Sequence, residues 1–252
     1  MSQYKIFFDT SENMKKHKVK DVKLMITSPP YWDLKDYEAE NQIGYNEDYD
    51  TYLNRLYKVW KNTFDVMQKD GVAIININTK SFKSSLKLLP NDFIKQMQKI
   101  GFYFKDVHYW HKSSGIPAKN NLKDNFEYFL IFSKSKNINF KKEIDFFDYK
   151  LNSRPSRSNI WNVNKKFGSV GKKFMIHPAI FPVNYISRML EIFTNENDLV
   201  LEPFLGSGTT LISCMQNNRK FVGFELNNKE YKELIKENIK SHDLDFTLVK
   251  VN

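Results

Sequence analysis

The hexapeptide Thr27-Ser28-Pro29-Pro30-Tyr31-Trp32 groups atoms that could bind an amine. The Ser28 hydroxyl oxygen can accept one hydrogen bond, and two consecutive prolines fix an extended turn that leaves the Pro29 carbonyl free to accept another. The Tyr31 ring offers a face on which a planar group could stack. Two acceptors beside an aromatic ring suit a conjugated amine, which must be held in line with its electrophile. Taken alone, the motif favours a proline-rich turn that ends a buried strand.

A second motif lies near the C-terminal end, where a short apolar run leads into a glycine-rich turn. The run Asp198–Glu202 predicts a strand that ends in an acid, and Pro203–Thr210 predicts a turn that enters a helix. Glycines allow a ligand to approach the backbone, and the first N–H groups of a helix can bind it. Glu225 ends the next predicted strand, where a carboxylate can accept hydrogen bonds from both ribose hydroxyls. The sequence therefore predicts a nucleoside site.

Two other glycine-rich sites do not fit this turn. A phosphate-binding P-loop needs Lys before Ser or Thr, whereas Gly208 is followed directly by Thr209 and Thr210. The dinucleotide fingerprint needs a third glycine, and Leu211 occupies that position. An ordinary loop between a strand and a helix remains the alternative to a nucleoside site.

Together the two motifs resemble the signature of β-group DNA amino-methyltransferases, in which the catalytic motif precedes the cofactor motif. The resemblance implies an enzyme that uses S-adenosylmethionine, releases S-adenosylhomocysteine and acts on double-stranded DNA without a metal ion. It implies catalytic roles for Ser28, Pro29, Pro30 and Tyr31. The cofactor residues that it implies next to these two motifs are Thr27, Glu202, Phe204, Gly206, Ser207, Gly208, Thr209 and Glu225.

Two further segments resemble cofactor-binding parts of the same family. The predicted strand Tyr4–Phe8 leads to Asp9, the position of an acid that lies near the adenine of the cofactor. Asp9 is equally suited to be the N-cap of the helix-like stretch that follows, and the two roles are compatible. The segment His177–Pro182 resembles the motif that contacts the methionine end of the cofactor, which assigns His177 and Phe181 to the cofactor site.

The first residue of the catalytic motif bears on the target base. Members that methylate adenine N6 mostly carry Asp or Asn there, whereas those that methylate cytosine N4 mostly carry Ser, as Ser28 does here. The resemblance therefore favours the N4 amine of a cytosine flipped out of the duplex. Adenine N6 is the alternative target, and RNA or a protein amide is a more distant one. A non-catalytic DNA-binding subunit would belong to a different class.

Apolar runs predict the elements that position these motifs. The predicted strands are Tyr4–Phe8, Val22–Thr27, Val72–Asn76, Phe102–Trp110, Phe126–Phe132, Leu199–Leu201 and Phe221–Phe224. The predicted helices are Tyr49–Met67, Asn91–Ile100, Pro182–Phe193, Thr209–Gln216 and Asn228–Ile239. Because short apolar strands alternate with helices, we predict an α/β fold with a doubly wound, mostly parallel sheet. The resemblance implies the Rossmann-like form of this fold.

Positive charge is concentrated in the middle of the chain. The stretch from Lys105 to Lys173 holds 15 Lys and Arg against 6 Asp and Glu, whereas the formal net charge of the whole chain is +10. Residues 135–175 interleave basic with aromatic side chains, which predicts a short basic insertion that recognises the DNA target. A solvated Lys-rich surface is the alternative. The candidate DNA contacts are Trp32, Arg154, Arg157, Lys165, Lys166, Lys172 and Lys173.

Length and composition limit the remaining possibilities. The 252 residues, 41% of them hydrophobic, suit a single methyltransferase domain over residues 1–252. No apolar run predicts a membrane span or a signal peptide, and the single cysteine, Cys214, excludes an internal disulfide. We therefore expect a cytoplasmic protein of a bacterium or archaeon. The resemblance admits a homodimer, and a cognate restriction endonuclease that acts separately, as partners.

Overall fold

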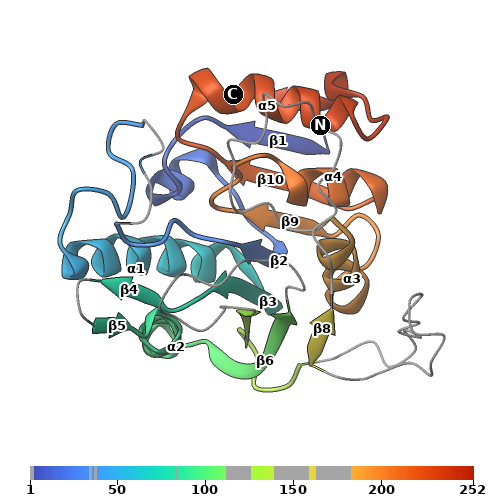
Figure 1. The fold of residues 1–252 in the computed structure, drawn as a ribbon. Coiled ribbons are helices and arrows are strands. Elements are labelled where there is room, and N and C mark those ends of the chain that lie inside the picture. Colours follow the sequence, from blue (N-terminus) through green and yellow to red (C-terminus); the bar gives the residue numbers. More distant parts are fainter. Residues whose placement is uncertain are drawn as a thin grey trace.

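The computed structural model describes residues 3–33, 36, 39–82, 85–111, 126–138, 159–162 and 183–252. The strands of its main sheet are β1 (Tyr4–Phe7), β2 (Val22–Thr27), β3 (Met67–Ile77), β6 (Tyr103–His111), β7 (Phe126–Ser133), β8 (Ile160–Asn162), β9 (Leu199–Glu202), β10 (Lys220–Phe224) and β11 (Val249–Val251). They lie in the order β11-β1-β10-β9-β2-β3-β7-β6-β8 (Figure 1). Strand β7 is antiparallel to β3 and β6, and the other neighbours are parallel.

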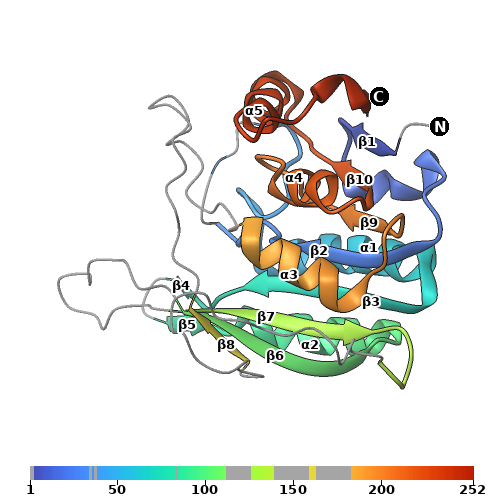
Figure 2. The same cartoon turned by 90° about the vertical axis from the view of Figure 1, so that its right-hand side faces the viewer.

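Helices cover both faces of this sheet. The α-helices are α1 (Tyr49–Val66), α2 (Leu89–Ile100), α3 (Val183–Phe193), α4 (Thr209–Gln216) and α5 (Asn228–Lys240), and the 3-10 segments are η1 (Ser11–His17) and η3 (Phe246–Leu248). Helices α3, α4 and α5 pack on one face, whereas η1, α1 and α2 pack on the other (Figures 1 and 2). None of the helices in the described part of the chain is long and apolar enough to cross a membrane.

Two hydrophobic clusters, one on each face, hold the layers together. In β2, Leu24 and Ile26 pack beneath α3, α4 and α5, whereas Met25 points to the side of α1 and α2, and all three are fully buried. Successive side chains of a strand point to opposite faces, so a strand covered on both sides must be apolar at every position. This requirement explains why the sheet strands appear in the sequence as continuous apolar runs.

Local sequence signals set the ends of the helices. Asp48 is the N-cap of α1 and accepts a hydrogen bond from the backbone N–H of Thr51 at 2.8 Å. Pro90 stands in the first turn of α2, and Gly101, with a φ of 119°, ends that helix in the left-handed region. Asn227 is the N-cap of α5 and accepts a hydrogen bond from Glu230 at 3.2 Å. These residues fix where α1 and α5 begin and where α2 ends.

The predicted doubly wound, mostly parallel sheet is confirmed, and each predicted strand occurs, β2 with the predicted bounds and the others with shifts at their ends. Strand β3 differs most, because it starts at Met67, directly after α1, rather than at Val72. Four strands were not predicted, namely β8, β11 and the separate hairpin of β4 (Lys80–Phe82) and β5 (Ser85–Lys87). Each of these has only three residues, too few for a recognisable period. Of the predicted insertion at 135–175, only 135–138 and 159–162 are described.

The sheet has a switch point between β9 and β2. The two strands are parallel neighbours, yet β9 continues into α4 on one face and β2 leads to α1 on the other. Connections that diverge in this way leave a crevice outside the carboxyl ends of the strands, where doubly wound proteins bind their ligands. Both motifs from the sequence follow these strands directly, Ser28 after β2 and Pro203 after β9.

Gly223 in β10 leaves room for a turn beside this crevice. A Cβ atom at this position would lie 2.7 Å from the Phe221 ring and 3.2 Å from Leu205. We expect Gly223→Ala to lower the free energy of unfolding by about 1–3 kcal/mol, the usual cost of overpacking, as measured by urea denaturation. Adding Phe221→Leu should recover part of the loss, because it removes the atoms that clash. Equal stability of Gly223→Ala and the wild type would contradict this packing.

Candidate active site

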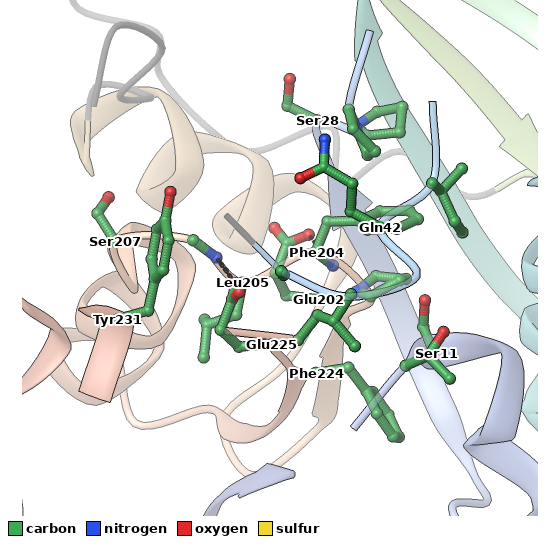
Figure 3. Close-up of a pocket in the computed structure, with 18 of the residues that line it drawn as sticks. Ser11, Ser28, Gln42, Glu202, Phe204, Leu205, Ser207, Phe224, Glu225 and Tyr231 are labelled. Carbon is green, nitrogen blue, oxygen red and sulfur yellow. Dashed lines mark hydrogen bonds between the residues drawn. The ribbon is translucent and has the colours of Figure 1, made fainter. Parts of the chain in front are cut away.

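A cavity of about 450 Å³ opens at the switch point, a size typical of pockets for small molecules and cofactors, which are roughly 300–1,000 Å³. Its walls contain residues that follow four parallel strands: Asp9 after β1, Ser28 after β2, Pro203 after β9 and Glu225 after β10. Figure 3 shows Glu202 near the middle, with Ser28 on one side and Glu225 on the other. Parallel alignment brings these separate chain segments to a single site.

The turn Pro203–Gly208 is held by hydrogen bonds to its main-chain groups. Gly206 and Gly208 have φ values of 53° and 83°, in the left-handed region that glycine adopts without strain. The N–H of Leu205 donates to the carbonyl of Phe224 at 2.8 Å, which ties the turn to the end of β10. The Ser207 carbonyl accepts a hydrogen bond from the Asn238 side chain at 2.8 Å. The turn therefore presents a fixed backbone surface to a ligand.

Glu225 faces this turn across the cavity wall. Its Oε2 accepts a hydrogen bond from the N–H of Gly206 and its Oε1 accepts one from the N–H of Asn227, both at 2.9 Å. A carboxylate has about four acceptor positions, so acceptor capacity remains for a ligand. Burial raises the pKa of Glu225 to about 7, against the opposing effect of its backbone donors. The group suits a ligand that brings hydroxyl donors or positive charge.

Glu202 places a buried carboxyl group between β9 and β2. Its Oε1 accepts hydrogen bonds from the hydroxyl of Thr27 and, at 3.2 Å, from the N–H of Phe204. Its Oε2 accepts one from the hydroxyl of Thr210 at 3.0 Å. Burial, which leaves the residue 2% exposed, raises the pKa of Glu202 to about 8 despite these donors. A cation in the cavity would favour the ionised form.

The segment Ser28–Tyr31 forms the opposite wall. The hydroxyl of Tyr52, on α1, donates to the carbonyl of Pro30 at 2.9 Å and so fixes the main chain of the motif. The hydroxyl of Ser28 donates to the side-chain carbonyl of Asn76 at 3.3 Å. Both hydrogen bonds connect the motif to elements packed beside β2, so its position is set by the fold.

Trp32 does not line the cavity. Its side chain is 7% exposed, its indole N–H donates to the carbonyl of Glu47 at 3.0 Å, and its ring meets that of Tyr49 edge to face at 4.9 Å. Burial in the cluster beside α1 conflicts with the predicted DNA contact. In this structure Trp32 anchors the chain that follows Ser28–Tyr31.

A further part of the wall, residues 39–43, is fastened by Arg55. The guanidinium group, on α1, donates to the carbonyls of Asn41 and Gln42 at 2.7 and 3.1 Å. It also pairs with Glu12 of η1 at 2.6 Å and with Glu47 at 3.2 Å. Because η1 begins at the cavity, the side chain of Arg55 joins two of its walls.

Asp9 lines the cavity at the end of β1. Thr10, not Asp9, is the N-cap of η1, so the predicted capping role of Asp9 is wrong. The carboxylate instead accepts hydrogen bonds from the N–H of Thr10 at 2.7 Å and the amide of Asn13 at 3.0 Å, and lies 2.7 Å from His17 Nε2. Partial burial would raise the pKa of Asp9, but the hydrogen bonds from His17 and Asn13 outweigh it and lower that pKa.

The sequence over residues 22–237 matches the model of the N6/N4 DNA methylase family, described as "DNA methylase". The chain belongs to this family. It is 30% identical over 250 residues to the orphan methyltransferase M.BamHII of Bacillus amyloliquefaciens, with 88% of this chain and 89% of that protein covered. It is 28% identical to the type II methyltransferase M.MjaI of Methanocaldococcus jannaschii, with 100% and 97% covered.

Solved structures share the fold of this DNA methylase. The TTHA0409 protein of Thermus thermophilus, complexed with S-adenosyl-L-methionine, superposes with a TM-score of 0.71 at 23% identity, over 99% of each chain. The PvuII DNA methyltransferase, described as cytosine-N4-specific, superposes with a TM-score of 0.71 at 18% identity, over 98% of this chain and 94% of its own. Both likenesses support the Rossmann-like methyltransferase form of the α/β fold.

The cavity of the DNA methylase gathers 11 of the 14 predicted site residues that the structure describes. Those that line it are Ser28, Pro29, Pro30, Tyr31, Asp9, Glu202, Phe204, Gly206, Ser207, Thr209 and Glu225. Thr27 and Gly208 support the wall from behind, Thr27 through its bond to Glu202 and Gly208 as the N-cap of α4. The residues outside the described part of the chain are His177, Phe181, Arg154, Arg157, Lys165, Lys166, Lys172 and Lys173.

Several lining residues were missed by sequence reasoning. Gln42 and Ile43 belong to a segment without a helical or strand period, and only its attachment to Arg55 brings it to the cavity. Ser11 follows the predicted acid Asp9 and could have been found as part of the same strand end. Tyr231 lies in the first turn of α5, and a signal for it existed, because that helix begins three residues after Glu225.

The raised pKa of Glu202 makes the stability of the ligand-free protein depend on pH. An unfolded glutamate titrates near pH ~4.3, whereas folded Glu202 keeps its proton up to about pH 8. Between these values the folded state binds more protons, so the free energy of unfolding falls as pH rises, by at most about 1.4 kcal/mol per pH unit. We expect Glu202→Gln to remove this part of the slope in urea denaturation. If the free energy of unfolding varies with pH in the same way for both proteins, Glu202 is ionised in the folded state over this pH range.

Arg55 also makes a testable contribution to stability. Replacing it by Met would leave Glu12 and Glu47, which are 16% and 13% exposed, without their shared cation. We expect Arg55→Met to cost about 1–3 kcal/mol of unfolding free energy, because partly buried acceptors lose their donor. The control is Lys58→Met, because Lys58 is 66% exposed and lies 3.7 Å from Glu12, so it should cost at most about 1 kcal/mol. Equal losses in the two variants would argue against the fastening role.

Proposed function

We propose that this DNA methylase transfers the methyl group of S-adenosylmethionine to the N4 amine of a cytosine flipped out of double-stranded DNA. The observation that carries the proposal is the shared cavity: Ser28 lines one wall, and the turn at Gly206 with Glu225 lines another. A methyl transfer requires donor and acceptor to meet in line within one enclosed site. The methyl donor would lie on the wall of Gly206 and Glu225, and the acceptor base on the wall of Ser28.

The chemistry of the wall formed by β1, β9 and β10 suits S-adenosylmethionine. Glu225 keeps acceptor capacity for ribose hydroxyls, and Asp9 offers a carboxylate to the adenine amine. Glu202 adds a third carboxyl group to the same cavity, which favours a ligand with positive charge. The glycine turn allows close approach of the backbone. When bound, the cofactor supplies an electrophilic methyl group on a positively charged sulfur.

The opposite wall would hold the base. We propose that the oxygen of Ser28 and the carbonyl of Pro29 accept the two amine hydrogens and so favour a tetrahedral nitrogen. The bond from Tyr52 to Pro30 keeps this short segment in place. Stacking on Tyr31 would contribute roughly 1–3 kcal/mol, which is comparable with the few kcal/mol that base flipping costs. The cytosine assignment rests on Ser28 as the first residue of the motif.

The DNA-binding surface is proposed from charge. The basic residues Arg154, Arg157, Lys165, Lys166, Lys172 and Lys173 belong to the stretch that carries most of the excess positive charge. Contacts from such residues to phosphates release counterions, so DNA affinity should fall steeply with salt. The type II methyltransferases among the relatives support a restriction–modification role, in which a separate endonuclease cuts unmodified DNA. A homodimer remains part of the proposal by analogy with the family.

Nucleoside mass spectrometry of DNA incubated with the protein and S-adenosylmethionine tests this function. We expect N4-methylcytosine, and Ser28→Ala should lower its rate about 100-fold or more while leaving cofactor affinity within about twofold. Glu225→Ala should instead weaken cofactor binding about tenfold or more, because hydrogen bonds to a charged group are lost. If the product is N6-methyladenine, the proposed active site is retained and the target base is adenine instead of cytosine. No methylated base in DNA would overturn the proposal.

A further inference from the structure

Asn76 interrupts an apolar face of the sheet beside the catalytic motif. Thr27 pairs with Ile75 in the parallel β2–β3 register, so Ser28 and Asn76 come next on neighbouring strands. On this face the preceding residues are Ile26 and Ile74, and the cross-strand partner of Asn76 is Phe129, all fully buried. Asn76 itself is 2% exposed. Burying an amide among such neighbours costs free energy unless it is hydrogen-bonded, so the partners of Asn76 decide whether it is tolerated there.

The hydrogen bonds of Asn76 determine which way its amide points. Its Nδ2 donates to the carbonyl of Tyr128, on β7, at 3.2 Å. A flipped amide would set its oxygen against that carbonyl, two acceptors in contact, so the orientation follows from the network. Oδ1 is thereby directed to the other side, where it accepts the hydroxyl hydrogen of Ser28 at 3.3 Å. The amide is held from β7 and presents a fixed acceptor to Ser28.

A serine hydroxyl has one hydrogen and two lone pairs, so it can act as donor or acceptor. Once its hydrogen is directed to Asn76, only its lone pairs are available to the cavity. An exocyclic amine offers two hydrogens and needs acceptors. The adjacent ring nitrogen of the base offers a lone pair and would attract a donor. The direction of a single hydroxyl hydrogen therefore decides whether Ser28 binds the amine or the ring nitrogen.

We propose that Asn76 is a positioning residue that fixes the Ser28 hydroxyl as a hydrogen-bond acceptor for the target amine. This inference rests on the proposed methyl transfer to a base amine and applies equally to cytosine N4 and adenine N6. A neutral amide neither takes a proton from Ser28 nor gives one to the base. Asn76 therefore acts only through the direction of one hydrogen bond, and its effect must disappear when the Ser28 hydroxyl is absent.

A double-mutant cycle between Asn76 and Ser28 tests this dependence. The rate of methyl transfer is measured in single turnovers with radiolabelled S-adenosylmethionine. Asn76→Leu, of similar size but without an acceptor, should lower the rate about tenfold or more in the wild-type background and less than twofold with Ser28→Ala. Cofactor affinity, measured by calorimetry, should stay within about twofold throughout.

Asn78 provides the matched control, one residue beyond the end of β3. Its Nδ2 donates to a carbonyl of β7, that of Phe126, at 3.0 Å, but its Oδ1 accepts the N–H of Thr79. Asn78→Leu should therefore change the rate by the same factor with and without the Ser28 hydroxyl. If Asn76→Leu is additive in the same way, or leaves the wild-type rate unchanged, the positioning role of Asn76 is overturned and the proposed function is unaffected. No methylation of DNA by the wild type would overturn this inference together with the proposed function.

Discussion

The hydrogen bond between Thr27 and Glu202 joins the strand that leads to Ser28 to the strand that leads to the glycine-rich turn. The residues are 175 positions apart in the chain, yet they end neighbouring parallel strands, and the hydroxyl of Thr27 donates to the carboxyl group of Glu202. The switch point exists only because β2 and β9 pair here and then diverge to opposite faces. The pairing therefore determines both where the cavity opens and which two motifs share it.

A second constraint is the cost of burying polar groups at that cavity. The carboxyl group of Glu202 accepts hydrogen bonds from three donors, and the guanidinium group of Arg55 is surrounded by two carboxylates and two carbonyls. The amide of Asn76 is bonded at both ends. Each group is stable inside the protein because its partners come from other elements, which have to be packed first. The arrangement of the polar side chains around the cavity thus depends on the packing of the whole fold.

The sequence was informative wherever the signal was contiguous. The apolar runs located each strand that ends at the cavity, and Ser28 and Glu225 could be assigned because their neighbours in sequence carry the motif. Contacts between distant segments were not predictable in this way. The bond from Asn76 to Ser28 depends on strand register, and the attachment of residues 39–43 depends on Arg55 on another element. The burial of Trp32 was likewise not predictable, since it depends on Glu47 and Tyr49.

The two walls of the cavity are held by separate sets of hydrogen bonds. The turn around Gly206 is held through its own main-chain groups, with the N–H of Gly206 donating to the Glu225 carboxylate and the N–H of Leu205 donating to the Phe224 carbonyl. Most substitutions of the turn's own side chains would leave these bonds in place. The Ser28 wall is held through side chains, with Tyr52 bonded to Pro30 and Asn76 bonded to Ser28. A change at one of these side chains would alter the acceptors that face the cavity without altering the register of the sheet. The polar groups of the Ser28 wall can therefore change while the glycine-rich turn on the other wall stays in place.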